Sequence, residues 1–318
     1  MVETSPRIAV VGASGAVGRV TLQLLLQRGY SNIRTFASWR SAGQMLGNFE
    51  LEAASVAALG SGDFDVCFFS VGAATSATLV PAASAAGALC IDKSSAFRLR
   101  DDVPLVVPEV NGERALENTG IVANPNCCAI PLSMVLAPLH EAAGLRRVRV
   151  ATYQSVSGAG AEAIEDLRGQ SPDQHKLSMD WAFDGVEFDE EVKLREETRK
   201  ILELPDLPIS ATCVRVPVVV GHAQAVWLET IAPLSPKAAE RALREAPGLH
   251  LEQVPMPARA IGVDEVLVGR VRAERGVENG LVLFTICDNL LKGAALNAVQ
   301  IAELVIGAQS PAYIGHRS

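Results

Sequence analysis

A short apolar segment near the start of the chain runs directly into a glycine-rich turn. Residues 7–11 (RIAVV) are typical of a buried strand, and residues 12–18 (GASGAVG) lead from it into an Ala- and Leu-rich segment. Such a succession predicts a strand, a tight turn and a helix. Short β-branched runs alternate with helical segments up to about residue 125, which predicts an α/β fold with a doubly wound parallel sheet.

The sequence pattern changes near residue 147. Long strand-like runs dominate from there, so we expect a second, α+β domain with a mixed sheet. An apolar helix at residues 292–306 needs a covering surface and is expected to pack on the first domain. The first domain is then residues 1–126 with 292–318, Rossmann-like, and the second is 127–291. Expected strands are residues 7–11, 33–37, 64–71, 88–92, 121–123, 147–156, 209–219, 225–231, 265–271 and 280–287.

Composition excludes several classes of protein. Of the 318 residues, 49% are hydrophobic, which is enough apolar material for two cores. A net charge of -8 argues against nucleic-acid binding. No apolar run approaches the roughly 20 residues that span a bilayer and no signal peptide is recognisable, so we expect a cytoplasmic protein without a membrane partner. The six cysteines form no CxxC pair, and we expect free thiols and no metal site.

The glycine-rich turn favours dinucleotide binding. Glycines let the backbone approach a pyrophosphate, whose charge is met by free N–H groups at the start of the helix. The spacing is GxxGxxG rather than GxGxxG, so a tight turn without a ligand is the alternative. The candidate cofactor-binding residues in the turn are Gly12, Ser14, Gly15, Ala16, Val17 and Gly18.

The segment after the second expected strand favours NADP over NAD. An NAD site usually places an acidic residue about 20 residues beyond the turn, where it binds the ribose hydroxyls. Here Ser38, Arg40 and Ser41 occupy that segment, and a guanidinium flanked by hydroxyls suits a 2′-phosphate. The alternative is that Arg40 is a solvated loop cation.

Two adjacent cysteines stand where a strand ends and an apolar helix begins. The unpaired N–H groups of a first helical turn stabilise a thiolate, so this is a position for a nucleophile. Adjacent helical residues point about 100° apart, and only one of Cys127 and Cys128 is therefore expected to react. The remaining cysteines are expected to be small buried hydrophobic residues. They are Cys67, Cys90, Cys213 and Cys287.

A thiol nucleophile needs a proton partner, and His222 is the candidate. It follows a strand-like run, in an expected Gly221-His222 turn. Arg215 interrupts that apolar run, and an arginine is costly to bury without an anion. Arg215 therefore indicates a carboxylate or phosphate ligand, with an edge-strand arginine pointing to water as an equal alternative.

Seven blocks, in order along nearly the whole chain, resemble the aspartate-β-semialdehyde dehydrogenases. The resemblance implies NADPH-dependent reduction of L-aspartyl-4-phosphate to L-aspartate-4-semialdehyde and phosphate, in biosynthesis of lysine, threonine, methionine and isoleucine. It also implies a homodimer or homotetramer, with cofactor binding in the first domain and catalysis and dimerisation in the second. The blocks are residues 11–18, 94–98 (SSAFR), 106–111 (VVPEVN), 123–127 (ANPNC), 153–160 (YQSVSGAG), 214–217 with 221–222, and 292–297 (KGAALN).

The resemblance also implies roles for individual residues. Three are catalytic: Cys127 as the nucleophile, Gln154 orienting the acyl intermediate, and His222 as acid and base. Others bind substrate: Arg215 the carboxylate, Glu191 the amine, Arg98 and Lys193 the phosphate, and Asn126 the carbonyl. Asn289 is expected to contact the cofactor.

Some features depart from the family pattern. Cys128 stands where Ser or Thr is usual, Lys93 where Asn is usual, and Leu291 where Arg is usual. The segment 170–190 is shorter than the family norm. Glu191 and Lys193 are two residues apart and face different ways on a regular helix, so a shared role requires an irregular helix start.

Two other interpretations stay open. An enzyme like N-acetyl-γ-glutamyl-phosphate reductase shares the nucleotide domain and the thiol chemistry, although it lacks several of the blocks. A catalytically silent NADP-binding paralogue would keep the fold. The joint presence of Cys127, Gln154, Arg215 and His222 argues against such a loss of activity.

Overall fold

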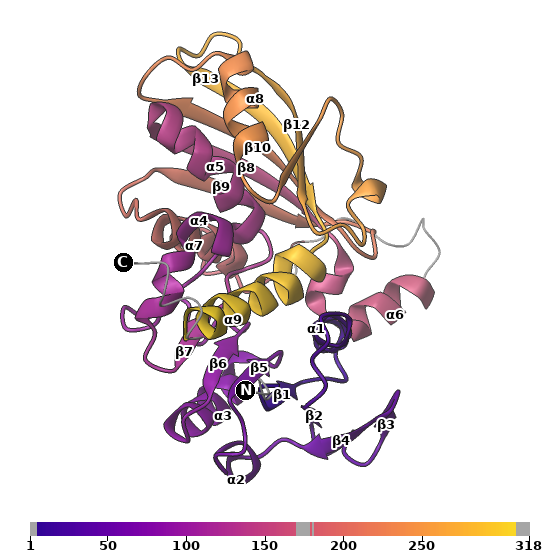
Figure 1. Cartoon of the computed structure of the whole chain (residues 1–318). Helices are drawn as coiled ribbons and strands as arrows, with labels where there is room; N and C mark the ends of the chain where they lie inside the picture. Colours follow the sequence, from indigo (N-terminus) through magenta and orange to yellow (C-terminus); the bar gives the residue numbers. More distant parts are fainter. Residues whose placement is uncertain (1–4, 170–178, 180, 310–318) are drawn as a thin grey trace. The chain divides into compact units, whose positions relative to one another are not determined.

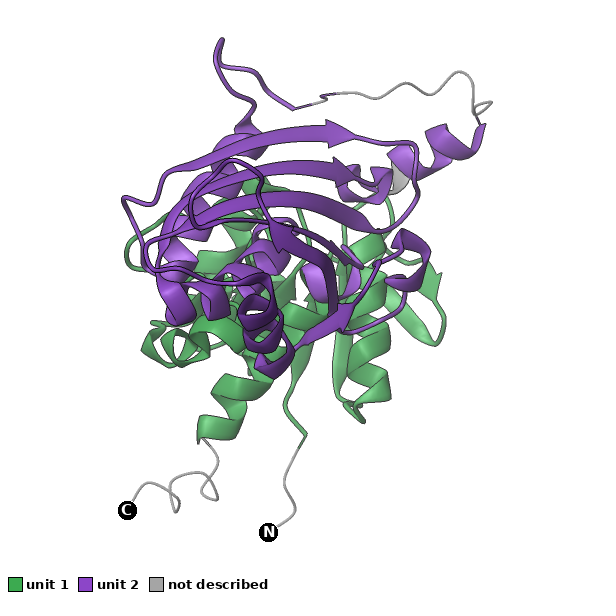
Figure 2. Ribbon diagram, turned by 90° about the horizontal axis from the view of Figure 1, so that it is seen from above, with its two compact units in different colours: residues 1–125, 294–318 green, residues 126–293 purple. Residues whose placement is uncertain are grey.

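The computed structural model describes residues 5–169, 179 and 181–309. The chain divides into two compact units (Figure 2): Met1–Pro125 with Ala294–Ser318, and Asn126–Gly293. The domain boundaries expected from the sequence lie within two residues of these limits. The expectations for residues 170–178 and 310–318 lie outside the described residues.

The first unit is built on a seven-stranded sheet with the order β3-β4-β2-β1-β5-β6-β7 (Figure 1). All pairings are parallel except that of β3 with β4. The strand order reverses at β1, which confirms the doubly wound prediction and makes the carboxyl end of β1 the usual place for a dinucleotide. The strands are β1 (Ile8–Val11), β2 (Ile33–Ala37), β3 (Met45–Leu46), β4 (Phe49–Ala53), β5 (Val66–Phe69), β6 (Leu89–Asp92) and β7 (Ile121–Ala123).

The C-terminal helix belongs to the first unit, as expected. It contacts α1, β6 and η1, and Asn297 near its start donates from Nδ2 to Val106 O (3.0 Å) and Asn124 Oδ1 (2.9 Å). The helices of this unit are α1 (Ala16–Gln27), α2 (Val56–Leu59), α3 (Ala73–Ala85), α4 (Pro108–Asn111), the 3₁₀ helix η1 (Gly112–Glu117) and α9 (Leu296–Gln309), which follows a π-helical turn η4 (Leu291–Ala295).

One helical segment, Leu291–Ala308, is long and apolar enough to cross a membrane by length and composition. The sequence predicts no such segment, because Lys292 and Asn297 interrupt its apolar residues and only the helical structure joins residues 291–295 to α9. In the structure 56% of this segment is buried inside the protein. Core helices of folded proteins meet the same criteria of length and composition.

The second unit is built on a six-stranded mixed sheet with the order β11-β12-β13-β10-β8-β9. β11 with β12 and β8 with β9 pair in parallel, and the other pairings are antiparallel. The predicted mixed sheet is therefore confirmed. The strands are β8 (Leu145–Gln154), β9 (Ile209–Arg215), β10 (His222–Thr230), β11 (Leu249–Glu252), β12 (Val266–Ala273) and β13 (Gly280–Cys287).

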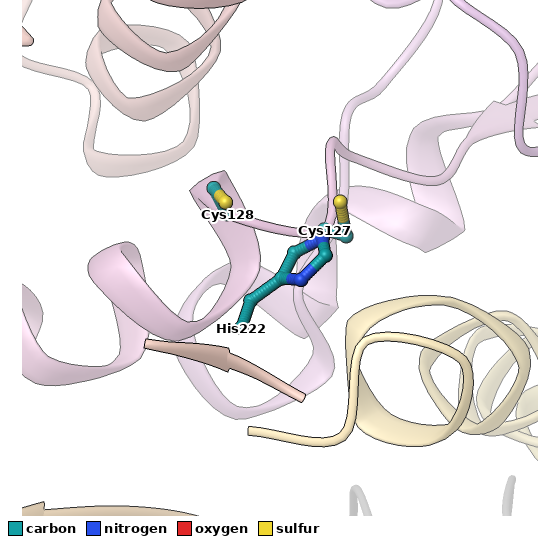
Figure 3. A group of neighbouring side chains, drawn as sticks. All are labelled: Cys127, Cys128 and His222. Carbon is teal, nitrogen blue, oxygen red and sulfur yellow. The ribbon is translucent and has the colours of Figure 1, made fainter. Parts of the chain in front are cut away.

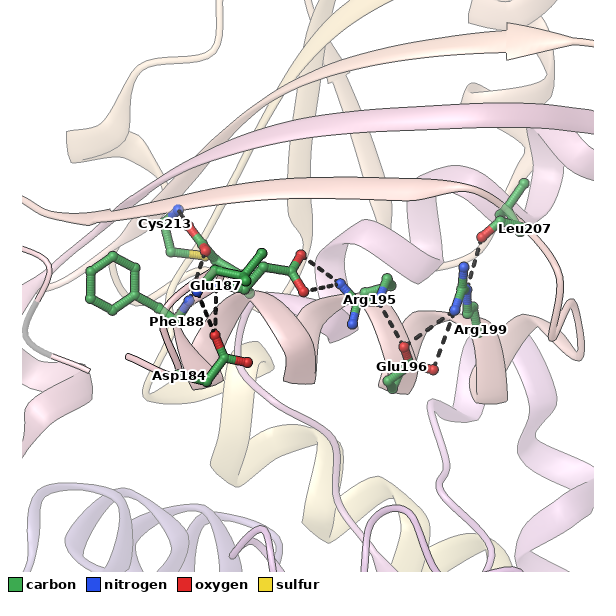
Figure 4. Close-up of polar contacts among 10 residues, drawn as sticks. Asp184, Glu187, Phe188, Arg195, Glu196, Arg199, Leu207 and Cys213 are labelled. Carbon is green, nitrogen blue, oxygen red and sulfur yellow. Dashed lines mark hydrogen bonds and ion pairs between the residues drawn. The ribbon is translucent and has the colours of Figure 1, made fainter. Parts of the chain in front are cut away.

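Helices α5 and α7 pack on each other and on this sheet, and α8 packs on α5. α5 is almost wholly apolar and buried, whereas α7 carries charges along its outer side. Arg199 of α7 donates from Nε to Leu207 O (2.8 Å), which ties the helix to the segment that leads into β9 (Figure 4). The helices are α5 (Ala129–Ala143), η2 (Val156–Ala159), α6 (Ala161–Gly169), α7 (Asp189–Leu202), α8 (Pro236–Glu245) and η3 (Pro257–Arg259).

Three short strands were not predicted: β3, β4 and β11. Each lies at or next to the end of its sheet, and β11 has no fully buried residue. Such strands lack the apolar run by which buried strands are recognised. Two other predictions were displaced. β9 ends at Arg215 rather than at residue 219, and His222 is the first residue of β10 rather than part of a turn.

Candidate active site

Several strand ends of the second sheet bring the predicted catalytic residues together. Gln154, the last residue of β8, pairs in register with Arg215, the last residue of β9. His222, the first residue of β10, pairs with Cys287 at the end of β13, and β8 and β10 are themselves neighbours. Gln154, Arg215 and His222 are all buried, at 1%, 5% and 1% exposure. A water-facing Arg215 is therefore ruled out.

The two adjacent thiols lie beside the histidine (Figure 3). The sulfur atoms of Cys127 and Cys128 and a ring nitrogen of His222 lie within 4.8 Å of one another. Helix α5 begins at Ala129 with Cys128 as its N-cap, so Cys127 precedes the helix and the expected 100° divergence of the two side chains does not apply. The N–H of Ile130 nevertheless bonds to Asn126 O (3.1 Å), so Cys127 adjoins the first turn.

Burial distinguishes the two thiols. Cys127 is half-buried, whereas Cys128 has no exposed surface. Burial raises the pKa of the Cys128 thiol well above its ordinary value, and the neighbouring Cys127 and Glu190 add to the effect. Cys128 therefore stays a thiol, and Cys127 is the more accessible of the two and the candidate nucleophile. The remaining cysteines are all buried, as predicted: Cys67, Cys90, Cys213 and Cys287.

Hydrogen bonds fix the tautomer of His222. The backbone N–H of Ser155 donates to Nδ1 (3.0 Å), and an N–H group can only donate. The hydrogen of the neutral ring must therefore lie on Nε2, which has no hydrogen-bond partner among the described residues. A metal on Nε2 would displace this hydrogen, and Nδ1 could not take it up while it accepts from the N–H of Ser155. This cluster of two thiols and one imidazole therefore suits proton chemistry better than metal binding.

A buried hydrogen-bond network supports the Nδ1 side of the His222 ring. Ser155 Oγ lies 3.1 Å from His222 Nδ1 and donates to Asn289 Oδ1 (3.0 Å). Asn289 Oδ1 also accepts from Gly221 N (2.8 Å), and its Nδ2 donates to Ser157 Oγ (2.9 Å). Asn289, expected to contact the cofactor, is thus also part of the hydrogen-bond network behind His222. Sequence reasoning missed Ser155, because its partners lie up to 134 residues away.

Asn126 anchors the nucleophile's loop to α7. Its backbone N–H donates to Glu197 Oε2 (2.6 Å), and its Nδ2 donates to Glu190 Oε1 (2.9 Å). Its own Oδ1 accepts from Cys128 N (2.7 Å). Because Glu190 and Glu197 are buried, these charge-assisted bonds hold the backbone on both sides of Cys127 firmly in place.

The structure corrects the expectation for Glu191. Its Oε2 accepts from the N–H of Phe188, as in a capping box, and its Oε1 accepts from the N–H of Cys213 (3.0 Å each). Both oxygens of Glu191 therefore already accept backbone hydrogen bonds that stabilise the start of α7 and its contact with β9. The surface of the same helix is tied by ion pairs of Arg195 with Glu187 and Glu196 (Figure 4).

Glu190 is the carboxyl group that lies toward the nucleophile. Burial raises its pKa and the nearby Cys127 sulfur adds to the effect, whereas hydrogen bonds from Asn126 and Gln154 and the charge of Lys193 oppose it. α7 is regular from Asp189, and Lys193 lies 2.7 Å from Asp189 Oδ2 and 3.8 Å from Glu190 Oε2. A spacing of three residues thus puts Glu190 and Lys193 on one side of the helix without any irregular start.

Arg215 is held with its guanidinium plane fixed. Its Nη1 donates to Ser155 O (3.0 Å), and its Cζ lies 4.6 Å from the centroid of the Trp181 ring. A side chain at Gly158 would approach Arg215 Nη1 and His222 Nε2 to 3.2 Å. The glycine therefore keeps open the space in front of both groups.

In the first unit, the glycine turn lies at the carboxyl end of β1. Gly12 has a φ of +82° and a Cβ there would lie 2.2 Å from Ser70 O, while a Cβ at Gly18 would lie 2.1 Å from Gly12 O. The turn itself thus requires these two glycines. Gly15 has an ordinary φ of -75°, and its Cβ would meet Gly12 O only at 3.4 Å. The backbone conformation therefore does not require a glycine at position 15. A pyrophosphate that approaches the backbone closely would require one, so the turn fits such a ligand.

The start of α1 is free for an anion. Gly15 is its N-cap and supplies no side-chain cap, and the first turn, which begins with Ala16, Val17 and Gly18, has no acidic residue. Arg19 donates to Ser14 O (2.9 Å) and stabilises the turn. The arrangement of free N–H groups and helix dipole is typical of phosphate sites.

The segment beyond β2 forms an exposed turn. The N–H groups of Ser41 and Ala42 donate to Ser38 O (2.9 and 3.1 Å), and Ser38 and Arg40 are exposed. Arg40 is thus a solvent-accessible cation at the carboxyl end of β2, where the adenosine end of a dinucleotide binds in this fold.

Arg98 and Lys93 lie together in the first unit. Arg98 is buried and donates to Asn124 O (3.0 Å) and Lys93 O (2.6 Å). Lys93 Nζ donates to Thr21 Oγ1 (3.1 Å) of α1 and Ser70 Oγ (3.0 Å) after β5. Lys93 therefore connects α1 to the carboxyl end of the sheet. The shorter side chain of Asn, the usual residue at this position in the family, could not make both contacts.

Lys93 makes stability depend on pH. Burial lowers its pKa to about 7, and Asp92 opposes the shift. Between about pH 7 and pH 10 the unfolded chain binds one proton more at this position, so folding gains stability as pH rises. The free energy of unfolding of the wild type should rise by about 2 kcal/mol relative to Lys93→Met between pH 7.5 and 9.5 in urea titrations. A difference that is constant over this range would contradict the burial of the amine.

Comparisons with known proteins agree with this geometry. A family profile described as semialdehyde dehydrogenase, NAD binding domain, matches residues 7–118, and one described as semialdehyde dehydrogenase, dimerisation domain, matches residues 136–292. The class is therefore that of the semialdehyde dehydrogenases, with an NAD(P)-binding domain and a dimerisation domain.

Individual relatives indicate which family within the semialdehyde dehydrogenases the chain resembles. The chain is 44% identical to an aspartate-semialdehyde dehydrogenase of Streptomyces akiyoshiensis and 42% identical to that of Aquifex aeolicus, each over 94% of this chain and 98% of the relative. A crystal structure of aspartate semialdehyde dehydrogenase II from Vibrio cholerae, complexed with ASA, superposes with a TM-score of 0.90 at 36% identity, covering 97% of this chain and 100% of that one. The chain belongs to the aspartate-semialdehyde dehydrogenase family.

Proposed function

We propose that this protein is an enzyme that reduces L-aspartyl-4-phosphate to L-aspartate-4-semialdehyde and phosphate with NADPH. The observation that carries the proposal is the buried group of Gln154, Arg215 and His222 around the half-buried thiol of Cys127. This group occurs in a chain that resembles aspartate-semialdehyde dehydrogenases over 94% of its length.

The chemistry centres on the Cys127 sulfur. The thiolate attacks the acyl carbonyl, and the bond to phosphate breaks as the thioester forms. The glycine turn would hold NADPH, which when bound would supply the hydride for reduction of the thioester. His222, with its hydrogen on Nε2, donates to the oxygen that gains negative charge, and Gln154 orients the acyl group. Collapse of the thiohemiacetal on Cys127 then releases the aldehyde and restores the sulfur.

Substrate recognition uses the charges around the thiol. Arg215, with its plane fixed by Ser155 O and Trp181, suits the substrate carboxylate. Glu190, rather than Glu191, suits the substrate amine, since it lies toward Cys127 and Glu191 is bound to backbone N–H groups. Three further residues are proposed to bind substrate. Lys193 and Arg98 are assigned to its phosphate group, and Asn126 to its carbonyl group.

The cofactor is assigned to the first unit. The residues of the turn from Gly12 to Gly18 would hold the pyrophosphate, and Ser38, Arg40 and Ser41 the 2′-phosphate of NADP. Arg40→Ala should raise the Kd for NADPH by about 10- to 100-fold and leave that for NADH within about twofold, because a cation and a phosphate form a charge-assisted pair. Arg114→Ala, a change of an exposed arginine of η1, is the control. An unchanged preference in Arg40→Ala would exclude this residue from cofactor selection.

The activity is tested most simply in reverse. The enzyme should turn over aspartate semialdehyde and NADP⁺ continuously only when phosphate is present, because phosphate must accept the acyl group from Cys127 before the next cycle can begin. Turnover only with N-acetylglutamate semialdehyde would instead indicate an enzyme like N-acetyl-γ-glutamyl-phosphate reductase. No turnover with either aldehyde would indicate a silent paralogue.

The setting of the reaction follows from the family. We propose a cytoplasmic enzyme in the biosynthesis of lysine, threonine, methionine and isoleucine. The match of residues 136–292 to a dimerisation domain supports a homodimer, or a homotetramer built from such dimers.

A further inference from the structure

Trp39 is the most exposed aromatic side chain in the described part of the chain, at 78% exposure. An exposed tryptophan leaves a large apolar surface in water, and single exposed apolar residues are common enough to need no purpose. The position of Trp39 in the fold nevertheless suggests that its exposed side chain has a function. It lies between Ser38 and Arg40, two residues beyond the end of β2.

The end of β2 is tied to the glycine turn. The N–H groups of Gly12 and Ala13 both donate to Phe36 O (2.8 and 3.0 Å), so β2 and the turn are held together at the carboxyl end of the sheet. β1 and β2 are neighbours in parallel register, with Val11 opposite Phe36. Trp39 is therefore three residues along the chain from Phe36, whose carbonyl oxygen holds the glycine turn. In a doubly wound fold the adenosine of a dinucleotide lies on this side of the turn.

The indole already has one planar partner. Arg40 Cζ lies 5.5 Å from the centroid of the Trp39 ring, within the range of a cation–π contact. The ring and the guanidinium thus form a small platform with most of the indole still open to solvent. A purine base is the part of NADP that matches such a platform, since bases stack favourably on aromatic rings.

We infer that Trp39 is the stacking surface for the adenine ring of the cofactor, while Arg40 binds the 2′-phosphate beside it. The inference rests on the cofactor site proposed above and adds a base-binding residue to it. Adenine is common to NAD and NADP, so Trp39 contributes affinity to both. Arg40 contributes selectivity for NADP. The two adjacent side chains thus have separable effects on cofactor binding.

Calorimetric titration of the full-length protein with adenosine 2′,5′-bisphosphate, NADP⁺ and NAD⁺ tests this division. Trp39→Ala should weaken the binding of all three ligands by about tenfold, and Trp39→Phe by no more than about threefold, because Phe keeps a ring to stack on. The ratio of the NADP⁺ and NAD⁺ dissociation constants should stay within about twofold in Trp39→Ala. Saturation with adenosine 2′,5′-bisphosphate should also quench tryptophan fluorescence in the wild type but far less in Trp39→Phe.

Two results would overturn the inference. If Trp39→Ala binds all three ligands as the wild type does, the indole makes no contact with the base. If it weakens only the ligands that carry a 2′-phosphate, the indole merely orients Arg40. A wild-type protein that binds none of the three ligands would instead refute the proposed cofactor site, and the role of Trp39 with it.

Discussion

Replacement of Cys127 by serine is expected to abolish turnover, with a fall in kcat of about four orders of magnitude or more. A serine hydroxyl is far less acidic than a thiol, and neutral His222 cannot take its proton, because Nδ1 is already bonded to the N–H of Ser155 and Nε2 carries the hydrogen. The acyl group then has no nucleophile to accept it. Steady-state assays with aspartate semialdehyde, phosphate and NADP⁺ measure the loss.

Cys128→Ser is the matched control for this loss. Cys128 is fully buried and its pKa is raised by burial, so its thiol takes no part in the reaction and the serine variant should keep much of the wild-type kcat. Members of the family usually have Ser or Thr at the position of Cys128, so a serine side chain should pack there without disrupting the fold. Loss of activity in Cys128→Ser with activity retained in Cys127→Ser would overturn the assignment of the nucleophile.

Glu190→Gln should lower kcat/KM for aspartate semialdehyde by about 100-fold, because removal of one partner of a buried charge pair costs several kcal/mol. The substrate amine loses its anionic partner, while the isosteric amide keeps the contact with Asn126. Glu191→Gln is the matched comparison on the same helix. It should change kcat/KM little and lower the free energy of unfolding by about 1 kcal/mol, since Glu191 caps the start of α7.

The two variants also differ in their response to pH. Burial raises the pKa of Glu190, so its carboxylate is protonated at a higher pH than an ordinary glutamate. KM for the substrate should rise as pH falls through this pKa in the wild type and in Glu191→Gln, but should not follow this titration in Glu190→Gln. A larger catalytic defect in Glu191→Gln than in Glu190→Gln would restore the assignment made from the sequence.

The contrast between Glu190 and Glu191 shows where sequence reasoning ends. The resemblance to the family pointed to Glu191 and Lys193 in this segment as candidate substrate-binding residues. It did not identify which carboxylate turns inward, since that depends on where the helix begins. α7 begins at Asp189, so Glu191 lies at the capping-box position and Glu190 one residue before it. The combination of Glu and Lys at a spacing of three was the signal that could have indicated Glu190.

The fold was predictable where strands are mostly apolar and buried, even when they are short. β1, β2, β7 and β13 appear within one residue of their expected limits, because runs of mostly apolar residues define them, whereas the longer β8 begins and ends two residues before its expected limits. The helix at Cys127 was correctly expected, but its first residue is Ala129, and a shift of this size changes which way the two thiols point. Local propensity does not set helix ends to the residue, since capping contacts come from other parts of the chain.

The support of His222 was not visible in the sequence at all. Ser155, Ser157 and Asn289 are ordinary polar residues in their own segments, and only the pairing of β8, β10 and β13 brings them together. The sequence therefore predicted the candidate reacting groups but not the hydrogen bonds that set the tautomer of the imidazole.

The most direct test of the account is a single-turnover experiment without phosphate. Enzyme mixed with aspartate semialdehyde and NADP⁺ should form NADPH up to one equivalent per subunit and then stop, because no acceptor is present to cleave the thioester. Acid quenching and peptide mass mapping should find one aspartyl group on the peptide that holds Cys127, and none in Cys127→Ser. NADPH formed without an acyl group on this sulfur, or an acyl group on Cys128 instead, would contradict covalent catalysis by Cys127.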